Sequence, residues 1–386
     1  MTMVYLMAQF VAGARILESM LLTSYETGLV LFSISVVGYT TYGGFRAVAW
    51  TDTMQGIVML LGIVSLVPFA VSAAGGLEKA TLELVHREDP AAAMRNVEPV
   101  RHAYLYGPGP QKIPEAPLDG SGPWPEPWLP IGMGISFFAM RSLGSVMMPT
   151  AVPRMLAFRD TASLRRALIL LAPYMLLMYG SSLITMNCAH AIDLGLAPDQ
   201  SDLAVPTLAR RVAPAWLAGL LIAAPFAAVM STVDSALLVI SAAVVRDIGQ
   251  KTVLPNLTPG STKRLSYMVT AMVGTAAFFL ALKKPPFLQP LIVYYVGGSV
   301  AALFWPGLAT LYWRRATATG VIAGLVGGAA VYVTADLVRP FDQLVRLHPF
   351  VYGFTVSGML VLAGSYLTRC QDERLLRFYF GSENRR

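Results

Sequence analysis

Long apolar segments alternate with shorter polar connections along almost the whole chain. Most of these segments approach the ~20 residues that an α-helix needs to cross the hydrocarbon core of a bilayer. We therefore predict an all-α integral membrane protein with about ten transmembrane helices. The predicted spans are Val4–Leu22, Gly28–Tyr42, Thr53–Ala73, Trp128–Met148, Leu168–Cys188, Trp216–Val244, Tyr267–Leu282, Leu288–Trp313, Gly320–Val338 and Val351–Leu367.

The apolar stretch Gly219–Asp247 contains an interrupting proline, Pro225, followed by a group of hydroxyl side chains. At helical spacing Ala228, Ser231 and Thr232 share one face, and Ser235 continues it. A face of small residues and hydroxyls inside a membrane helix allows close packing against another helix, or it offers oxygen atoms to a cation. Both interpretations are open from the pattern alone. Pro225 removes one backbone donor and loosens the preceding turn.

A second informative stretch, Tyr39–Gly62, places two glycines at the end of one span, with Asp52 and Gln55 at the start of the next. An aspartate at a helix N-terminus can act as a simple cap, because it accepts hydrogen bonds from free N–H groups. An ionisable group at membrane depth can also line the path of a cation. The sequence leaves both roles open for Asp52.

Composition supports a membrane protein: 55% of the residues are hydrophobic and only 13% are charged, whereas roughly a quarter are charged in soluble domains. Two cysteines, Cys188 and Cys370, form no metal-binding or disulfide pattern, and the four histidines are scattered. We find no Walker motif and no catalytic triad, so we expect no catalytic residue, no cofactor and no enzyme activity. The net charge of +7 gives no reason to expect a nucleic-acid partner, because most basic residues lie in short connections between spans.

If the spans alternate, the basic residues favour one side of the membrane, which the positive-inside rule assigns to the cytoplasm. Both chain ends and a short basic tail, residues 368–386, are then cytoplasmic, and residues 1–367 form a single transmembrane domain. The long connection 74–127 is extracytoplasmic, on the same side as the connection 189–214. Within the first span, Arg15 and Glu18 stand at i and i+3, where pairing lowers their cost in lipid. We expect a multi-pass protein of the cell membrane with no obligate protein partner.

Several ordered motifs carry a resemblance to a known family. The segment YTTYGGFRAVAWTDTMQ, from Tyr39, and the segment AAPFAAVMSTVDSALLVISAAVVRDI, from Ala223, resemble conserved patterns of the sodium/solute symporter family. The segments MAQFVAGARILE, SYETGLVLFSISVVGYT and KKPPFLQPLIVYYVGG resemble its sodium/pantothenate branch, and LFWPGLATLYWRRATATGVIAGLVGG continues the family pattern. The likeness covers most of the chain outside the long outer connection.

The resemblance implies a LeuT-like fold of inverted repeats, with sites near the midplane. It implies a Na⁺ site formed by the Ala228 carbonyl and by the hydroxyls of Ser231 and Thr232, and it places Asp52 on the inner exit route of the ion. Asp234 is assigned to the ion pathway or to a basic partner. Family members begin with about three further spans, including the helix that completes the Na⁺ site, so the chain resembles an N-terminally truncated member whose first repeat is incomplete.

We expect sodium-coupled symport of a small organic solute by alternating access, with Na⁺ as the coupling ion. Pantothenate, or another carboxylate, is the substrate that the resemblance favours, and proline, another acid or a sugar would also fit the family. Candidate substrate contacts are Phe138 and Arg141 in the fourth predicted span and Tyr295 in the eighth, although a partner within the protein would equally explain Arg141. Alternatives are an inactive paralogue, a transporter-like membrane sensor, for which the tail is short, and an ion channel, for which no filter-like loop is found.

Overall fold

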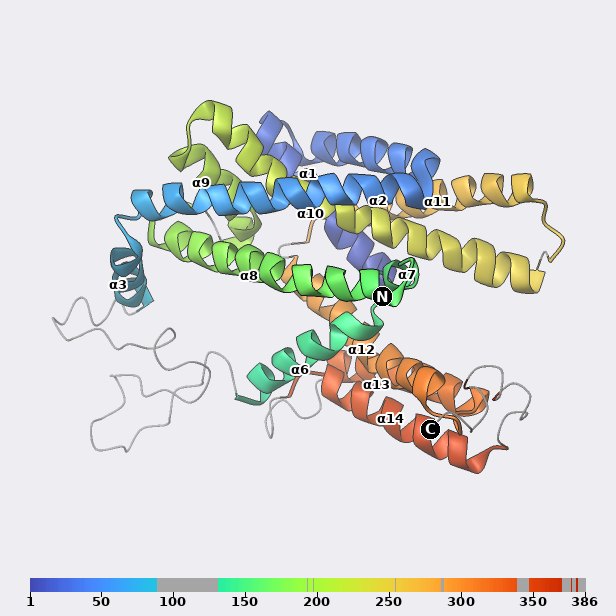
Figure 1. Cartoon of the computed structure of the whole chain (residues 1–386). Coiled ribbons are helices and arrows are strands. Elements are labelled where there is room, and N and C mark those ends of the chain that lie inside the picture. The colour runs from blue at the N-terminus through green and yellow to red at the C-terminus, as the bar shows by residue number, and fades with distance from the viewer. Residues whose placement is uncertain are drawn as a thin grey trace, which may run out of the picture. The chain divides into compact units, whose positions relative to one another are not determined.

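The computed structural model describes residues 1–88, 131–192, 194–196, 198–253, 255–285, 288–338 and 347–369, together with Leu376 and Phe380. In these ranges every element of regular secondary structure is a helix (Figure 1). In chain order they are α1 (Thr2–Leu21), α2 (Tyr25–Ala73), α3 (Leu77–Glu88), α6 (Ile131–Met147), α7 (Val152–Leu156), α8 (Thr161–Ile192), η1 (Pro198–Leu203), α9 (Ala204–Val212), α10 (Ala215–Ala242), the π-helix η2 (Ala243–Val253), α11 (Pro259–Ala281), α12 (Gln289–Tyr312), α13 (Ala318–Val338) and α14 (Phe350–Leu367).

The chain divides into two compact units. The first, here called the α10 unit, comprises residues 2–100 and 157–292; the second, the α14 unit, comprises Met1, residues 101–156 and residues 293–386. The α10 unit contains α1, α2, α3, α8, α9, α10 and α11, and the α14 unit contains α6, α7, most of α12, α13 and α14. The single transmembrane domain expected for residues 1–367 stays a prediction.

The all-α membrane fold expected from the sequence is confirmed. Among the described residues, 8 helices are long and apolar enough to cross a membrane. The predicted spans Gly28–Tyr42 and Thr53–Ala73 correspond to the two helical arms of α2, which meet at a kink at Gly44, where the backbone leaves helical geometry (φ 62°, ψ −173°). The positive φ explains the glycine, because a side chain at that position would be strained. The predicted span Trp128–Met148 corresponds to α6, which has 17 described residues.

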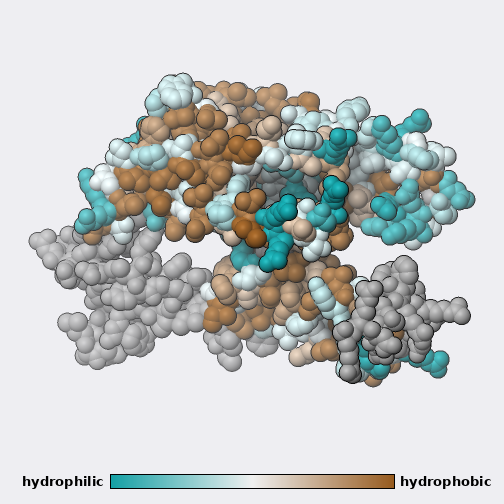
Figure 2. All heavy atoms as spheres, in the orientation of Figure 1, coloured by the Kyte–Doolittle hydropathy of each residue, from teal (hydrophilic) through white to brown (hydrophobic). Residues whose placement is uncertain are grey.

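The core of the α10 unit lies where α2 packs along α1 and α10 (Figure 1). Leu6 and Phe10 of α1 are fully buried, and so are Val233 and Leu237 of α10. The rings of Phe10 and Phe32 meet edge to face with their centroids 5.6 Å apart, a favoured aromatic geometry. On the face shown in Figure 2, apolar side chains cover much of the surface of this unit, and hydrophilic side chains gather over η2 and the start of α11. Apolar flanks with polar ends are typical of helices that cross a bilayer.

Both long connections contain helices that the sequence analysis did not predict. α3 follows α2 within the connection 74–127, and η1 and α9 lie within the connection 189–214. α9 buries Pro206, Leu208 and Ala209, while Arg210 and Arg211 occupy its last turn, where positive charge suits the helix dipole. These helices are amphipathic rather than apolar throughout, so a search for continuous apolar runs misses them.

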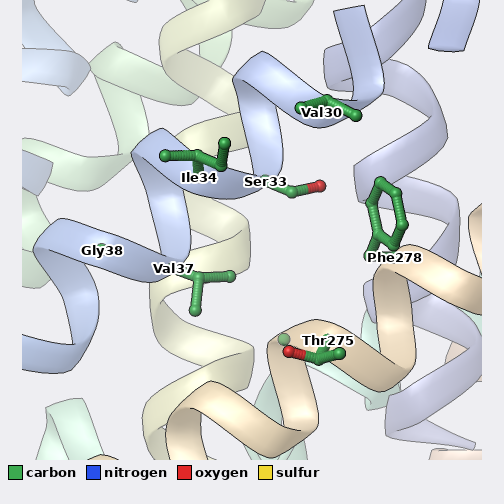
Figure 3. Close-up of a pocket in the computed structure, with 8 residues that line it drawn as sticks. Val30, Ser33, Ile34, Val37, Gly38, Thr275 and Phe278 are labelled. Carbon is green, nitrogen blue, oxygen red and sulfur yellow. The ribbon is translucent and has the colours of Figure 1, made fainter. Parts of the chain in front are cut away.

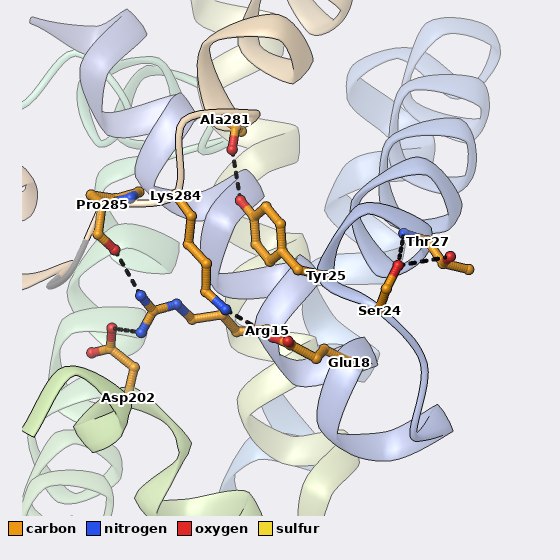
Figure 4. Close-up of polar contacts among 9 residues, drawn as sticks. All are labelled: Arg15, Glu18, Ser24, Tyr25, Thr27, Asp202, Ala281, Lys284 and Pro285. Atoms are coloured by element: carbon orange, nitrogen blue, oxygen red, sulfur yellow. Dashed lines mark hydrogen bonds and ion pairs between the residues drawn. The ribbon is translucent and has the colours of Figure 1, made fainter. Parts of the chain in front are cut away.

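A cluster of ionic contacts ties α1 to two connections of the α10 unit (Figure 4). Arg15, only 3% exposed, donates from Nη1 to Asp202 Oδ2 at 2.8 Å and from Nη2 to the Pro285 carbonyl at 2.7 Å. Glu18 pairs with Lys284, with 3.4 Å between Oε2 and Nζ. The sequence suggested that Arg15 and Glu18 pair with each other; the structure gives each of them a partner outside α1.

The α14 unit is held together by a seam of small residues between α13 and α14. A Cβ added at Gly324 would lie 2.9 Å from the Ser357 carbonyl oxygen, and one at Gly328 would lie 2.5 Å from the Ala301 carbonyl oxygen of α12. The backbones approach so closely that a side chain at these glycines would collide with main-chain atoms. Close backbone approach through small residues is the usual way in which membrane helices associate.

Candidate functional site

The hydroxyl-bearing face of α10 gathers three oxygen atoms within one helical turn. Ser231 donates from Oγ to the Ala228 carbonyl at 3.0 Å, and Thr232 donates from Oγ1 to the same carbonyl at 2.8 Å. All three residues are partly buried. The helix continues through Pro225 without a break, but the carbonyl one turn earlier receives no N–H from the proline.

These oxygens suit a small cation. Carbonyl and hydroxyl groups are hard ligands that match monovalent and alkaline-earth ions rather than soft transition metals. Each hydroxyl uses its single proton toward Ala228 and keeps lone pairs for another partner. Ser235 extends the pattern one turn further by donating to the Ser231 carbonyl at 2.8 Å. The described residues contain no group of three His, Cys, Asp or Glu side chains placed to hold a metal ion.

Asp234, on the same helix, is completely buried. Tyr39 donates from its hydroxyl to Asp234 Oδ2 at 2.5 Å, and Thr40 donates from Oγ1 to Oδ1 at 2.5 Å. Each carboxylate oxygen therefore has a short hydroxyl donor, the kind of charge-assisted bond that a buried carboxylate requires. Tyr39 and Thr40 belong to α2, so the carboxylate also fastens α2 to α10.

The sequence analysis did not assign a role to Tyr39 and Thr40, although both lie in the segment that carries the family resemblance. The signal that could have found them is the need of a buried carboxylate for donors. Nothing local to Asp234 says that those donors stand on another helix, because 194 residues separate it from Thr40.

Asp52 lies in α2, half-buried, about two helical turns beyond Gly44. A capping residue must precede the first turn of its helix. Asp52 is inside the second half of α2, so a simple cap does not describe it. Tyr174 of α8 donates to the neighbouring Gly56 carbonyl at 3.1 Å, which packs this part of α2 against α8.

The α10 unit also has a shallow cavity of about 310 Å³ between α2 and α11, lined by none of these residues. Ser33 and Val37 of α2 face Thr275 and Phe278 of α11 across it (Figure 3). Ile34, at its edge, is 70% exposed. The lining is mainly apolar and opens to the outer surface of the helices, so it offers an ion no set of ligands.

The three candidate substrate residues lie in the α14 unit in unlike environments. Phe138 is 76% exposed and Arg141 is also exposed, both on α6. Tyr295 of α12 is only 1% exposed. The two α6 side chains are therefore exposed, whereas the α12 side chain is buried.

A buried histidine that the sequence analysis set aside lies near these helices. His348 is 7% exposed; its backbone N–H donates to Ser136 Oγ of α6 at 3.2 Å, and its Nδ1 accepts from the Phe350 N–H at 3.3 Å. Its ring lies 5.3 Å from that of Phe137. Through these contacts His348 connects the start of α14 to α6.

Known proteins resemble this chain along nearly its whole length. The chain is 32% identical to the sodium/pantothenate symporter of Escherichia coli strain K12 over 362 residues, which cover 92% of this chain and 68% of that protein. It is 30% identical to the sodium/pantothenate symporter of Haemophilus influenzae, covering 95% of this chain and 69% of the relative. It is 27% identical to the high-affinity proline transporter PutP of Bacillus subtilis, and the match covers 96% of this chain and 71% of that protein.

Among solved structures, a substrate-bound, outward-open Na⁺-coupled sialic acid symporter matches with a TM-score of 0.68. The match covers 96% of this chain and 73% of that one, at 17% identity, and it confirms the expected transporter fold. The family model described as "Sodium:solute symporter family" matches residues 1–328. On these grounds the chain, a multi-pass membrane protein, belongs to the sodium:solute symporter family of transporters.

Proposed function

We propose that this chain carries pantothenate, or another small carboxylate, across the cell membrane together with Na⁺. The observation that carries the proposal is the group of three oxygens at Ala228, Ser231 and Thr232, which brings hard ligands together on one turn of α10. The substrate class is supported by the relatives: the two sodium/pantothenate symporters are 32% and 30% identical to this chain, and the sodium/proline symporter of Escherichia coli is 25% identical.

The coupling is thermodynamic. A Na⁺ ion bound at the α10 oxygens stabilises one arrangement of the helices, and the solute binds that arrangement more tightly. Because linkage is reciprocal, the solute raises the affinity for Na⁺ by the same factor. Alternating exposure of the two sites then moves both species in one direction, down the Na⁺ gradient.

The test is uptake of radiolabelled pantothenate into proteoliposomes with and without an inward Na⁺ gradient. We expect Ser231→Ala and Thr232→Ala each to raise the Na⁺ concentration for half-maximal uptake by roughly tenfold, because about 1.4 kcal/mol is the order of one lost oxygen ligand. Ser182→Ala is the matched control, since Ser182 bonds to the Met178 carbonyl of its own helix in the same way. Uptake that ignores the Na⁺ gradient, or unchanged Na⁺ dependence in both variants, would reject the proposal.

Asp52 is proposed to lie on the inner route of the ion, and Asp234 to support that route by holding α2 against α10. Asp52→Asn removes the charge while keeping the shape. We expect it to slow Na⁺ release more than it weakens solute binding, which efflux and equilibrium binding measure separately. Equal changes in the two quantities would assign Asp52 a general structural role instead.

Arg141, Phe138 and Tyr295 are proposed to contact the solute, and the guanidinium of Arg141 is suited to a carboxylate. We expect Arg141→Gln to raise the KM for pantothenate while the Na⁺ dependence stays that of the unaltered protein. Arg154→Gln, a neighbouring basic position on α7, is the control. If both variants raise KM equally, the effect reflects general charge and not a contact.

The proposed orientation places both chain ends in the cytoplasm. In variants with a single cysteine, Lys284→Cys should then react with an impermeant thiol reagent added to intact cells. Arg165→Cys should react only after the membrane is made permeable. Labelling of both positions from the outside would overturn this orientation.

A further inference from the structure

The α14 unit contains a groove of about 590 Å³ between α12 and α14. Trp305 and Phe354 line one end, with ring centroids 5.3 Å apart. Trp313 and Leu362 line the other end. Its volume falls in the range of roughly 300–1,000 Å³ that is typical of sites for small organic molecules.

A glycine keeps this groove open. A Cβ added at Gly358 would lie 3.0 Å from Nε1 of Trp305, so a side chain there would displace the indole. Trp305 is also packed against Phe304, whose ring centroid is 5.5 Å away. The indole is thus held at the head of the groove by its neighbours, and the space beside it is a fixed feature of the fold.

The groove opens on the outer surface of two candidate membrane spans. Along its rim Tyr312 is 76% exposed, Met359 is 61% exposed and Leu362 is 52% exposed. Both α12 and α14 are long and apolar enough to cross a bilayer. No water is available at that depth, so the natural occupant of such a rim is a hydrocarbon chain.

The end of the groove at Trp313 carries two arginines. Arg314 and Arg315 follow Trp313 directly in the sequence. The Arg315 guanidinium lies 5.1 Å from the Tyr366 ring centroid, and its Nη2 is 3.5 Å from the Tyr366 carbonyl at the end of α14. The rings of Trp313 and Tyr366 are 5.7 Å apart. Two cationic groups and two interfacial aromatics therefore stand where α12 and α14 leave the membrane.

Residues 305–320 and 350–369 contain no Asp or Glu, and the Arg314 guanidinium lies 5.9 Å from the centroid of the Phe380 ring. An arginine forms bidentate hydrogen bonds with phosphate. Basic pockets between membrane helices are suited to anionic lipid head groups. An acyl chain along the groove would place its head group at the arginines.

We propose that the groove between α12 and α14 binds an anionic phospholipid, with an acyl chain against Trp305 and Leu362 and its phosphate at Arg314 and Arg315. The groove shares no lining residue with the Na⁺ and solute candidates proposed above. Its occupant is a membrane lipid, which binds from the bilayer and is not transported.

The test is native mass spectrometry of the full chain in detergent, titrated with phosphatidylglycerol or phosphatidylcholine of the same acyl chains. We expect the unaltered protein to retain phosphatidylglycerol preferentially. Arg314→Gln with Arg315→Gln should weaken that binding roughly 25-fold, about fivefold for each arginine. Arg165→Gln with Arg166→Gln is the matched control: it removes two exposed charges from another connection and should leave retention unchanged.

A groove-filling variant separates the acyl-chain contact from the charge. Leu362→Trp should block retention of both lipids, while Leu337→Trp, on an equally lipid-exposed position of α13 (79% exposed), should not. In the unaltered protein, brominated phosphatidylglycerol should quench tryptophan fluorescence, and part of that quenching should disappear in Trp305→Phe.

Three results would overturn the proposal. They are equal retention of the two lipids by the unaltered protein, undiminished phosphatidylglycerol binding in the double arginine variant, and cross-linking of a Met359→Cys variant into a dimer that excludes lipid. If the arginine variant fails to fold, the role of the arginines is tested by how the lipid preference of the unaltered protein depends on salt. Preference for phosphatidylglycerol should fall as ionic strength rises, and a preference that salt does not change would refute the role of the arginines.

Discussion

The buried carboxylate of Asp234 gives a sharp test of how α2 and α10 are joined. Thr40→Val removes one of the two hydroxyl donors described above with almost no change in side-chain volume, and Tyr39→Phe removes the other. A hydrogen bond to a charged group contributes roughly 1.5–3 kcal/mol. Each variant should therefore lower the free energy of unfolding by about that amount.

The double variant distinguishes a shared network from two separate contacts. Independent sites would add to roughly 3–6 kcal/mol. Both donors serve one carboxylate, so we expect the double variant to lose less stability than this additive value. The reason is that a carboxylate short of donors in an apolar surrounding takes up a proton instead of staying charged. The shortfall from additivity measures the coupling.

The assay is unfolding in mixed micelles with increasing SDS, followed by tryptophan fluorescence. Two substitutions on the same helix serve as controls. Thr53→Val removes only a bond to the Ala49 carbonyl of its own helix, and Tyr42 is 76% exposed, so Thr53→Val and Tyr42→Phe should each stay within about 0.5 kcal/mol of the unaltered protein. If Thr40→Val is no more destabilising than Thr53→Val, the carboxylate does not depend on this donor and the reasoning is refuted.

Three further outcomes follow from the packing. Arg15→Met should cost roughly 3–5 kcal/mol of stability in the same assay, because removing one member of a buried ion pair strands the other; a loss near zero would show the pair to be solvated. Gly328→Ala should destabilise by about 1–3 kcal/mol through collision with a carbonyl oxygen, whereas Gly180→Ala, which meets no atom within 4 Å, should be neutral or stabilising. Asp160 accepts the Ser163 N–H at 2.6 Å at the start of α8, which holds the pKa of its carboxyl below the usual value. The carboxylate therefore stabilises the fold fully above its unfolded-state pKa, and this stabilisation is lost as pH falls through its lower pKa in the folded protein. Asp160→Ala should thus destabilise the protein at neutral pH and make no difference in strong acid.

The membrane class and most helix positions could be predicted from the sequence because they depend on local properties. A run of apolar residues needs no knowledge of the rest of the chain to be identified as a span. The grouping of Ala228, Ser231 and Thr232 is local in the same sense, since helical spacing alone brings their oxygens to one turn. Their role as ligands is a separate question, which the proposed uptake experiments test.

What the sequence could not supply is long-range pairing. Asp202 is 187 residues from Arg15, and neither residue marks the other in the sequence. The nearest opposite charge, Glu18, offered a plausible local partner, but the structure gives Arg15 and Glu18 partners from distant segments. The helices inside the two long connections were missed for another reason: they lack the continuous apolar run of a span, and burial of their apolar faces depends on tertiary contacts.

The glycine seam between α13 and α14 limits how the protein can move. Main chains that already touch have no room to slide or rotate past one another without atomic overlap, and interiors packed this closely resist small displacements. The two helices are therefore expected to travel as one inflexible block whenever the transporter changes state. Any bending needed for the cycle must then be absorbed elsewhere, at positions such as the interrupted turn of α2 at Gly44.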